Sequence, residues 1–231
     1  MTAAEWGLLV LLSMLWGGSF FFSKIIVQEV PPFTLVFARF AVAAGALGTY
    51  LRLRQVPVPG SVSAWAAFAG MGTLNNLIPA ALIAWGQTTI ASGLAAVLIA
   101  TTPVFSIVIA RCATPNDKMS ANTVAGVALG VARVSALVGT GTLNGSSRSV
   151  LAMLGCLAAA LSYGAANVFG RRFKRMGITP ATVAFGQLAA TAAMVAPIAL
   201  AVDRPWVLPL PGEAVWLSLI GLALLSTAWP T

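Results

Sequence analysis

The residues of this chain best suited to bind a ligand are neutral polar side chains inside long apolar stretches. Asn75 and Asn76 lie side by side in the apolar stretch 62–85, and Pro79 follows them. Two carboxamides supply hydrogen-bond donors and acceptors, and a proline lacks the N–H that would pair with an upstream carbonyl. The cluster predicts either a polar binding site within a helix or hydrogen bonds that only hold neighbouring helices together.

Four further candidates lie in two other apolar stretches, Trp16 and Ser19 in the first and Tyr163 and Asn167 in the sixth. If the two halves of the chain are related as described below, these side chains face one another across the axis between them. Trp16 lies about 15 Å along its helix from Trp6, which is too deep for an aromatic belt at the membrane surface. The alternative to a binding role is packing within the core.

Two cations, Arg39 and Arg133, also lie within apolar stretches. Arg39 is about 9 Å from the start of the stretch 33–51, so its side chain can extend to the membrane surface. Alternatively, it draws an anionic group, such as an amino-acid carboxylate, towards an internal cavity. Gln187 lies 148 residues after Arg39, at the corresponding place in the second half of the chain, and we expect both side chains to touch such a cavity.

The elements that must position these residues are apolar stretches, eight in all. The chain of 231 residues is 59% apolar and 8% charged, and its mean hydropathy is +0.93. A soluble domain carries roughly three times that charged fraction, and about 20 apolar residues cross a bilayer as a helix. We therefore expect an all-α, polytopic bundle in contact with the lipid bilayer. The stretches are 6–27, 33–51, 62–85, 89–110, 121–138, 150–170, 179–202 and the short 214–229.

The sixth and seventh stretches repeat the layout of the first and second. Val30-Pro31-Pro32 introduces the second stretch and Ile178-Thr179-Pro180 introduces the seventh, and Pro32 and Pro180 are 148 residues apart. A copy that begins after five spans enters the membrane the other way up. The pattern predicts two inverted repeats related by a pseudo-two-fold axis in the membrane plane, which is a common architecture of secondary transporters.

The basic residues predict an orientation. With the N-terminus in the cytoplasm, the inner loops hold eight Lys and Arg side chains and the outer loops hold three, as the positive-inside rule requires. The net charge of +8 is therefore spread over the ends of the apolar stretches, and we expect no nucleic-acid partner. The inner residues are Arg52, Arg54, Arg111, Lys118, Arg171, Arg172, Lys174 and Arg175, and the outer ones are Lys24, Arg148 and Arg204.

All five acidic side chains lie at the ends of apolar stretches or in loops, and the chain has no histidine. A proton relay through an intramembrane carboxylate has no carrier here. A membrane-embedded enzyme would need a nucleophile with a base or a metal cluster, and Cys112 and Cys156 lie too far apart in sequence to suggest one. The sequence predicts no catalytic residue, no metal and no cofactor. The acids are Glu5, Glu29, Asp117, Asp203 and Glu213.

Several short motifs, in their order and spacing, resemble the drug/metabolite transporter superfamily, EamA type. The first half contains most of them, and the resemblance covers nearly the whole chain. The motifs are LWGGSF at 15–20, VPPF at 30–33, ARF at 38–40, the Asn pair at 75–76, ASGLAA at 91–96, TPVF at 102–105, AGVALG at 125–130, ALSYG at 160–164 and GLALLST at 221–227.

This resemblance implies a permease in the bacterial cytoplasmic (inner) membrane that moves a small-molecule metabolite by alternating access. The substrate class that it implies is amino acids or related compounds, in the direction of efflux. We expect residues 1–140 to form a first repeat of five transmembrane helices. Residues 150–231 are expected to form a second, incomplete repeat of three.

The chain departs from the family in length. Members of the family have ten spans in two repeats of five, whereas this chain has eight, and the missing helices would close one side of the second half. One alternative is therefore a truncated bundle without transport activity. The other is an eight-helix protein that closes its bundle by another means, such as a homodimer.

Overall fold

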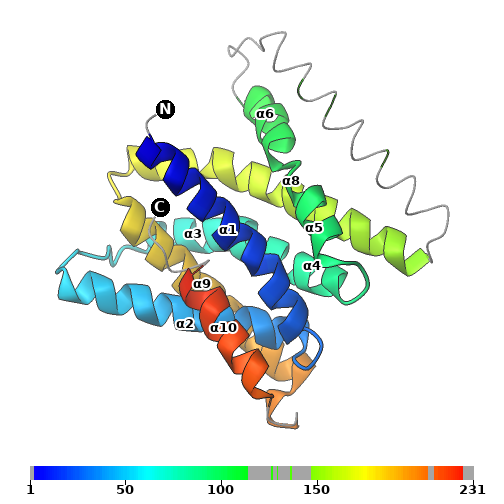
Figure 1. Ribbon diagram of the computed structural model, residues 1–231. Helices are drawn as coiled ribbons and strands as arrows, with labels where there is room; N and C mark the ends of the chain where they lie inside the picture. Colours follow the sequence, from blue (N-terminus) through cyan, green and yellow to red (C-terminus); the bar gives the residue numbers. More distant parts are fainter. Residues whose placement is uncertain are drawn as a thin grey trace.

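The structure is a computed structural model that describes residues 3–113, 126, 129, 136, 147–207 and 211–225. Every regular element in this part of the chain is helical (Figure 1). Within the described residues, five segments are long and apolar enough to cross a membrane, and the all-α membrane bundle predicted from the sequence is confirmed. The helices are α1 (Ala3–Ile26), α2 (Pro32–Leu53), α3 (Val62–Gly72), α4 (Ile78–Gln87), α5 (Ser92–Ile99), α6 (Thr102–Ala113), α8 (Ser147–Arg175), α9 (Pro180–Ile198) and α10 (Glu213–Leu225), with π-helices η1 (Thr73–Leu77) and η2 (Ala199–Asp203) and a 3₁₀ turn η3 (Pro205–Val207).

The predicted stretches agree with these helices in place but not always in length. The predicted stretch 150–170 is part of a longer helix, α8, of 29 residues. The predicted stretch 89–110 is interrupted, because α5 ends at Ile99 and α6 begins at Thr102. Most of the predicted stretch 121–138 and the last residues of 214–229 lie outside the described residues, although positions 126, 129 and 136 are helical.

Local sequence explains where the helices begin and end. Pro32 and Pro180 each occupy the first turn of a helix, where the missing N–H costs no hydrogen bond. The Ser61 and Thr179 side chains cap α3 and α9 by accepting from Ala64 N and Thr182 N. At the end of α8, Gly177 has a φ of +67°, a left-handed conformation that glycine adopts without strain.

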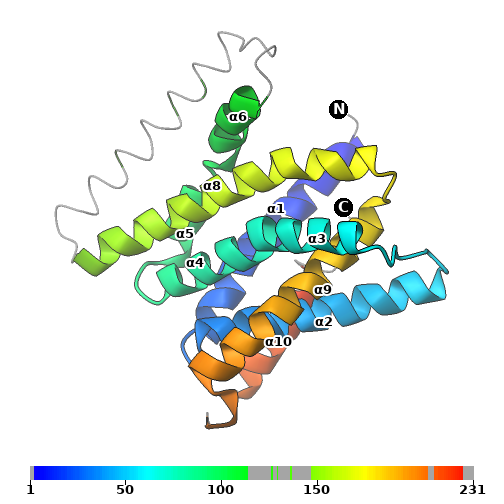
Figure 2. The same ribbon diagram turned by 180° about the vertical axis from the view of Figure 1, so that it is seen from behind.

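The helix pairings are symmetric between the two halves of the chain, so that exchanging corresponding helices leaves the same pairs in contact. Helix α2 packs against α9, while α4 packs against α8 and α1 packs against α10. Likewise α3 packs against α9 and α10 packs against α2 (Figures 1 and 2). Exchanging α1 with α8, α2 with α9, and α3–α4 with α10 reproduces each of these contacts. The α5–α6 segment packs along α8.

The contact between α3 and α9 is close because glycines lie on both sides of it. A methyl group on Gly72 would lie 2.8 Å from the Gln187 carbonyl oxygen, and one on Gly186 would lie 2.5 Å from the Phe68 ring. Phe68 is fully buried and stacks on Phe173 of α8, with ring centroids 5.7 Å apart. This packing holds η1, which follows Gly72, against the middle of α9.

At one end of the bundle, two carboxylates join the two halves. Asp203 Oδ2 at the end of η2 accepts hydrogen bonds from Thr34 N at 2.6 Å and Thr34 Oγ1 at 3.0 Å, in the first turn of α2. Glu29 Oε2, in the loop between α1 and α2, accepts from Gly212 N at 2.9 Å, just before α10. At the opposite end the last turns of α2 and α8 carry basic side chains, namely Arg52, Arg172, Lys174 and Arg175.

We expect Asp203→Ala to lower the stability of the bundle by about 1–2 kcal/mol, because an anionic acceptor at a helix N-terminus is lost. Asp203→Asn retains an oxygen acceptor without the charge and should lose less. Thermal unfolding of the detergent-purified variants measures both effects. An unchanged melting temperature in Asp203→Ala would contradict the expectation.

Candidate functional site

The π-helix η1 exposes one backbone carbonyl to another helix. Ile78 N donates to Thr73 O, five residues back, and in this register the next donor would be residue 79, which is Pro79 and has no N–H. Leu74 O instead accepts a hydrogen bond from Ser162 Oγ of α8 at 2.7 Å. A proline in α4 thus leaves a carbonyl to which α8 donates.

Both asparagines of η1 donate to α9. Asn75 Nδ2 donates to Gln187 Oε1 and Asn76 Nδ2 donates to Thr191 Oγ1, each at 3.2 Å. Thr191 Oγ1 in turn donates to Gln187 O at 2.7 Å. We refer to Leu74 O, Asn75, Asn76, Ser162, Gln187 and Thr191 as the polar cluster.

The members of the polar cluster differ in burial. Asn76 and Thr191 are buried, with 7% and 0% of their surfaces exposed, so their bond serves the packing of α9 against η1. Asn75 and Gln187 are only partly buried, so this pair is the accessible part of the cluster. Ser162 and Thr191 were not anticipated from the sequence. A hydroxyl that bonds to a neighbouring helix leaves no local sequence pattern.

Arg39 and Tyr163 approach each other from α2 and α8. The two side chains lie within electrostatic range, and both are partly buried. The Arg39 guanidinium carbon is also 5.4 Å from the centroid of the Phe40 ring. Arg39 therefore lies against residues of the bundle. The side chains of Trp16 and Ser19 lie outside the described part of the structure, so the predicted approach of Tyr163 to them is not seen.

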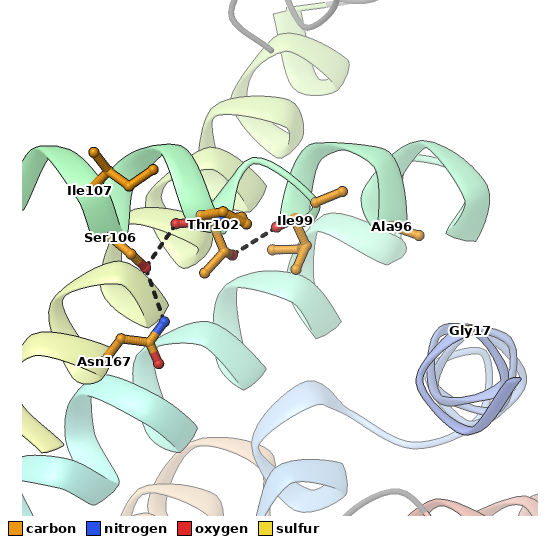
Figure 3. Close-up of a pocket in the computed structure, with 9 residues that line it drawn as sticks. Gly17, Ala96, Ile99, Thr102, Ser106, Ile107 and Asn167 are labelled. Atoms are coloured by element: carbon orange, nitrogen blue, oxygen red, sulfur yellow. Dashed lines mark hydrogen bonds between the residues drawn. The ribbon is translucent and has the colours of Figure 1, made fainter. Parts of the chain in front are cut away.

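An open pocket of about 660 Å³ lies between α1, the α5–α6 segment and α8 (Figure 3). Of the predicted site residues described, only Asn167 lines it. Gly17 of α1 lies on the opposite side of the pocket in Figure 3 and is the neighbour of the predicted Trp16. The described lining residues are Gly17, Ala96, Ile99, Ala100, Thr102, Pro103, Ser106, Ile107 and Asn167.

The polar wall of the pocket is built around the break between α5 and α6. Pro103 has no N–H for the carbonyl of Ile99, four residues earlier, and Thr102 Oγ1 donates to Ile99 O instead at 2.7 Å. Ser106 Oγ donates to Thr102 O and accepts from Asn167 Nδ2, both at 3.0 Å (Figure 3). The Thr-Pro pair within an apolar stretch was the sequence signal for this break.

The pocket and the polar cluster share α8. Ser162 of the cluster and Asn167 of the pocket are five residues apart, about 7.5 Å along a helix. Tyr163 and Asn167 are four residues apart and lie on the same face. In the part of the chain described, no three His, Cys, Asp or Glu side chains lie close enough together to hold a metal ion.

Comparison with known proteins identifies the family. The sequence profile of the EamA-like transporter family matches residues 5–138, more than half of the chain. The chain belongs to the EamA-like transporter family. The resemblance inferred from the sequence motifs is thereby confirmed.

Two curated relatives of this family member are named as transporters. One is the "Uncharacterized transporter YoaV" of Bacillus subtilis, 26% identical over 171 residues, which are 74% of this chain and 58% of the relative. The other is the "Uncharacterized inner membrane transporter YedA" of Escherichia coli K12, 29% identical over 180 residues, which are 72% of this chain and 53% of the relative. This EamA-like chain therefore spans a little over half the length of these relatives.

A solved crystal structure has the same fold. It matches 97% of this EamA-like chain and 76% of its own chain with a TM-score of 0.66 and 19% sequence identity. At that identity the comparison supports the arrangement of the helices and nothing about substrate.

Proposed function

We propose that this protein is a secondary transporter that moves small amphipathic metabolites by alternating access, with the open pocket as part of its substrate site. The observation that carries the proposal is the pocket itself. Its volume of about 660 Å³ is within the range of roughly 300–1,000 Å³ common for small-molecule sites. Its walls combine apolar side chains with a few neutral polar groups, as such sites require.

The other predicted site residues have separate roles in this proposal. Asn75 and Gln187, the accessible pair of the polar cluster, provide hydrogen-bonding groups along the substrate route. Arg39, within electrostatic range of Tyr163, attracts the anionic end of a substrate such as an amino acid. Trp16 and Ser19 lie on α1, the helix that supplies Gly17 to the pocket. Efflux of amino acids or related compounds is the substrate class and direction that we propose.

The repeat organisation is also part of the proposal. Residues 1–140 form a first repeat and residues 150–231 form an incomplete second repeat, inverted with respect to the first. The exchange of helix pairings described above supports this division. The helix interruption η1 in the first half is similar to the broken helices that transporters of this architecture use near their substrate sites.

We place the protein in the bacterial inner membrane with its N-terminus in the cytoplasm. The name of the Escherichia coli relative supports the membrane. The basic last turns of α2 and α8 support the orientation, because such clusters favour the cytoplasmic side. A homodimer is the proposed assembly.

A flux assay tests the proposal. The purified protein is reconstituted in liposomes loaded with a mixture of labelled amino acids, and their release is followed. Ala96→Trp should fill the pocket and reduce release at least tenfold, whereas Val97→Trp is the matched control. Ala96 lines the pocket, and its neighbour Val97 is an exposed residue of α5 outside the lining.

The outcomes separate the candidate functions. Release that is lost in Ala96→Trp and kept in Val97→Trp supports transport through the pocket. Equal release by both variants would show that the substrate site lies outside this pocket. No release by the wild-type protein above empty liposomes would favour the transport-inactive bundle, and chemically altered amino acids would favour an enzyme.

A further inference from the structure

The helix break beside the pocket leaves hydrogen-bond acceptors that the backbone does not satisfy. Pro103 cannot donate to Ile99 O, and Val104 N donates to Thr101 O at 2.9 Å rather than to Ala100 O. Among the described residues, no donor reaches Ala100 O. Ile99 and Ala100 both line the pocket, so the helix break lies at its wall.

The hydroxyl hydrogens of this wall are already used. The single hydrogen of Thr102 Oγ1 is donated to Ile99 O, and that of Ser106 Oγ is donated to Thr102 O. Asn167 uses one N–H to reach Ser106 Oγ. Its carbonyl oxygen, Oδ1, has no partner among the described residues and is turned away from Ser106 in Figure 3.

The polar wall of the pocket therefore has more unused hydrogen-bond acceptors than unused donors. Asn167 Oδ1, the lone pairs of Thr102 Oγ1 and the carbonyl of Ala100 remain as acceptors, while the second N–H of Asn167 is the remaining side-chain donor. None of the described lining residues is charged. Among the described lining residues a carboxylate would find one donor and no cation, so it would lose most of its hydration there without replacement, and the carboxylate end of an amino-acid substrate would lie away from this wall. An amine would find several oxygen atoms.

The rest of the lining selects for an apolar body. Gly17, Ala96, Ile107 and Pro103 supply apolar surface around the polar wall. A ligand that fits both parts has a compact apolar group and an N–H donor at one end. Charge alone does not meet this requirement, because the wall offers hydrogen-bond acceptors and no anionic side chain.

We propose that the pocket recognises primary amines with a compact apolar body through N–H donation to Asn167 Oδ1 and the oxygens of the α5–α6 break. It discriminates against anions and against cations that lack an N–H. The inference rests on the proposed function in taking this pocket as a substrate site, but it concerns binding, which is measured without transport.

Three probes of similar size separate the contributions. These are 2-phenylethylamine, the phenylethyltrimethylammonium cation, which keeps the charge without any N–H, and 3-phenylpropionate, which is an anion. Binding to the purified full chain in lipid nanodiscs is measured by isothermal titration calorimetry. We expect the amine to bind at least tenfold more tightly than either of the other probes, which corresponds to about 1.4 kcal/mol.

Two variants at one position test the role of Asn167. Asn167→Leu removes the acceptor and should abolish the preference for the amine. Asn167→Asp keeps the side-chain shape and adds a negative charge, so the affinity for 2-phenylethylamine should rise while the affinity for 3-phenylpropionate falls. Thr88→Val is the control, because Thr88 is an exposed residue with a hydroxyl bonded to Trp85 O, outside the lining set. It should bind all three probes as the wild type does.

Several results would overturn the inference. These are quaternary ammonium or propionate binding as tightly as the amine, no binding of any probe, and an unchanged preference in Asn167→Leu. The flux assay is independent of them. If the pocket prefers the amine but no flux is measured, the binding site is supported and the transport function is contradicted. If flux depends on the pocket but the amine is not preferred, the transport function is supported and the amine site is contradicted.

Discussion

A methyl group added at Gly164 is expected to separate α6 from α8 and to weaken ligand binding in the pocket about tenfold or more. The new carbon atom would lie 2.9 Å from both Ser106 N and Phe105 Cβ. Neither neighbour can rotate away, since one is a backbone atom and the other is fixed to the backbone. Overpacking of this kind costs about 1–3 kcal/mol, and Ser106 is part of the pocket wall.

Gly170→Ala is the matched control on the same helix. A methyl group there would meet the flexible end of Met71 at 3.5 Å, an ordinary contact. Titration calorimetry of both variants with 2-phenylethylamine, together with thermal unfolding, checks the expectation. Equal binding by Gly164→Ala and wild type would show that the α6–α8 contact does not shape the pocket.

Asn75→Leu is expected to reduce flux at least tenfold while leaving the folded bundle intact. Asn75 is the partly exposed member of the asparagine pair, and its single bond to Gln187 Oε1 ties it to another partly exposed side chain. Replacing it removes a partly exposed amide, which we propose to lie along the substrate route. The loss of one interhelical hydrogen bond lowers the free energy of unfolding of a membrane protein by only about 0.6 kcal/mol on average.

Asn76→Leu, the adjacent variant, should have the opposite effect. Asn76 is buried and bonded to Thr191, so its loss should lower the melting temperature, and flux per folded molecule should change little. The two variants are compared by liposome flux normalised to folded protein and by thermal unfolding in detergent. Normal flux in Asn75→Leu, or a selective loss in Asn76→Leu, would reverse the roles assigned to the pair.

The sequence predicts the bundle well because its main signals are long apolar runs and the charges at their ends, which depend on the membrane and not on details of packing. It also locates Asn75, Asn76 and Pro79, because amides and prolines are rare enough inside such runs to attract notice. The role of Pro79 required the structure. Only the positions of Leu74 and Ser162 show which carbonyl is left and what donates to it.

The pocket was harder to predict for a physical reason. Ala96, Ile99 and Ile107 look the same in sequence whether they face lipid, a neighbouring helix or a cavity. The break at residues 100 and 101 is marked in the sequence only by Thr101, Thr102 and Pro103, and the two threonine hydroxyls bond to the carbonyls of Leu98 and Ile99, as backbone groups inside a membrane require. Asn167 was predicted because it is polar, and it is the residue that marks the pocket.

The contacts of Glu29 and Asp203 have a consequence for any movement of the two halves against each other. Each carboxylate belongs to one half of the chain and accepts from a backbone N–H of the other half. Together the two hydrogen bonds hold the halves to each other at one end of the bundle. The opposite end of the bundle has the basic last turns of α2 and α8. If the two halves rock against each other, separating them at the carboxylate end requires both Glu29 and Asp203 to release their backbone donors.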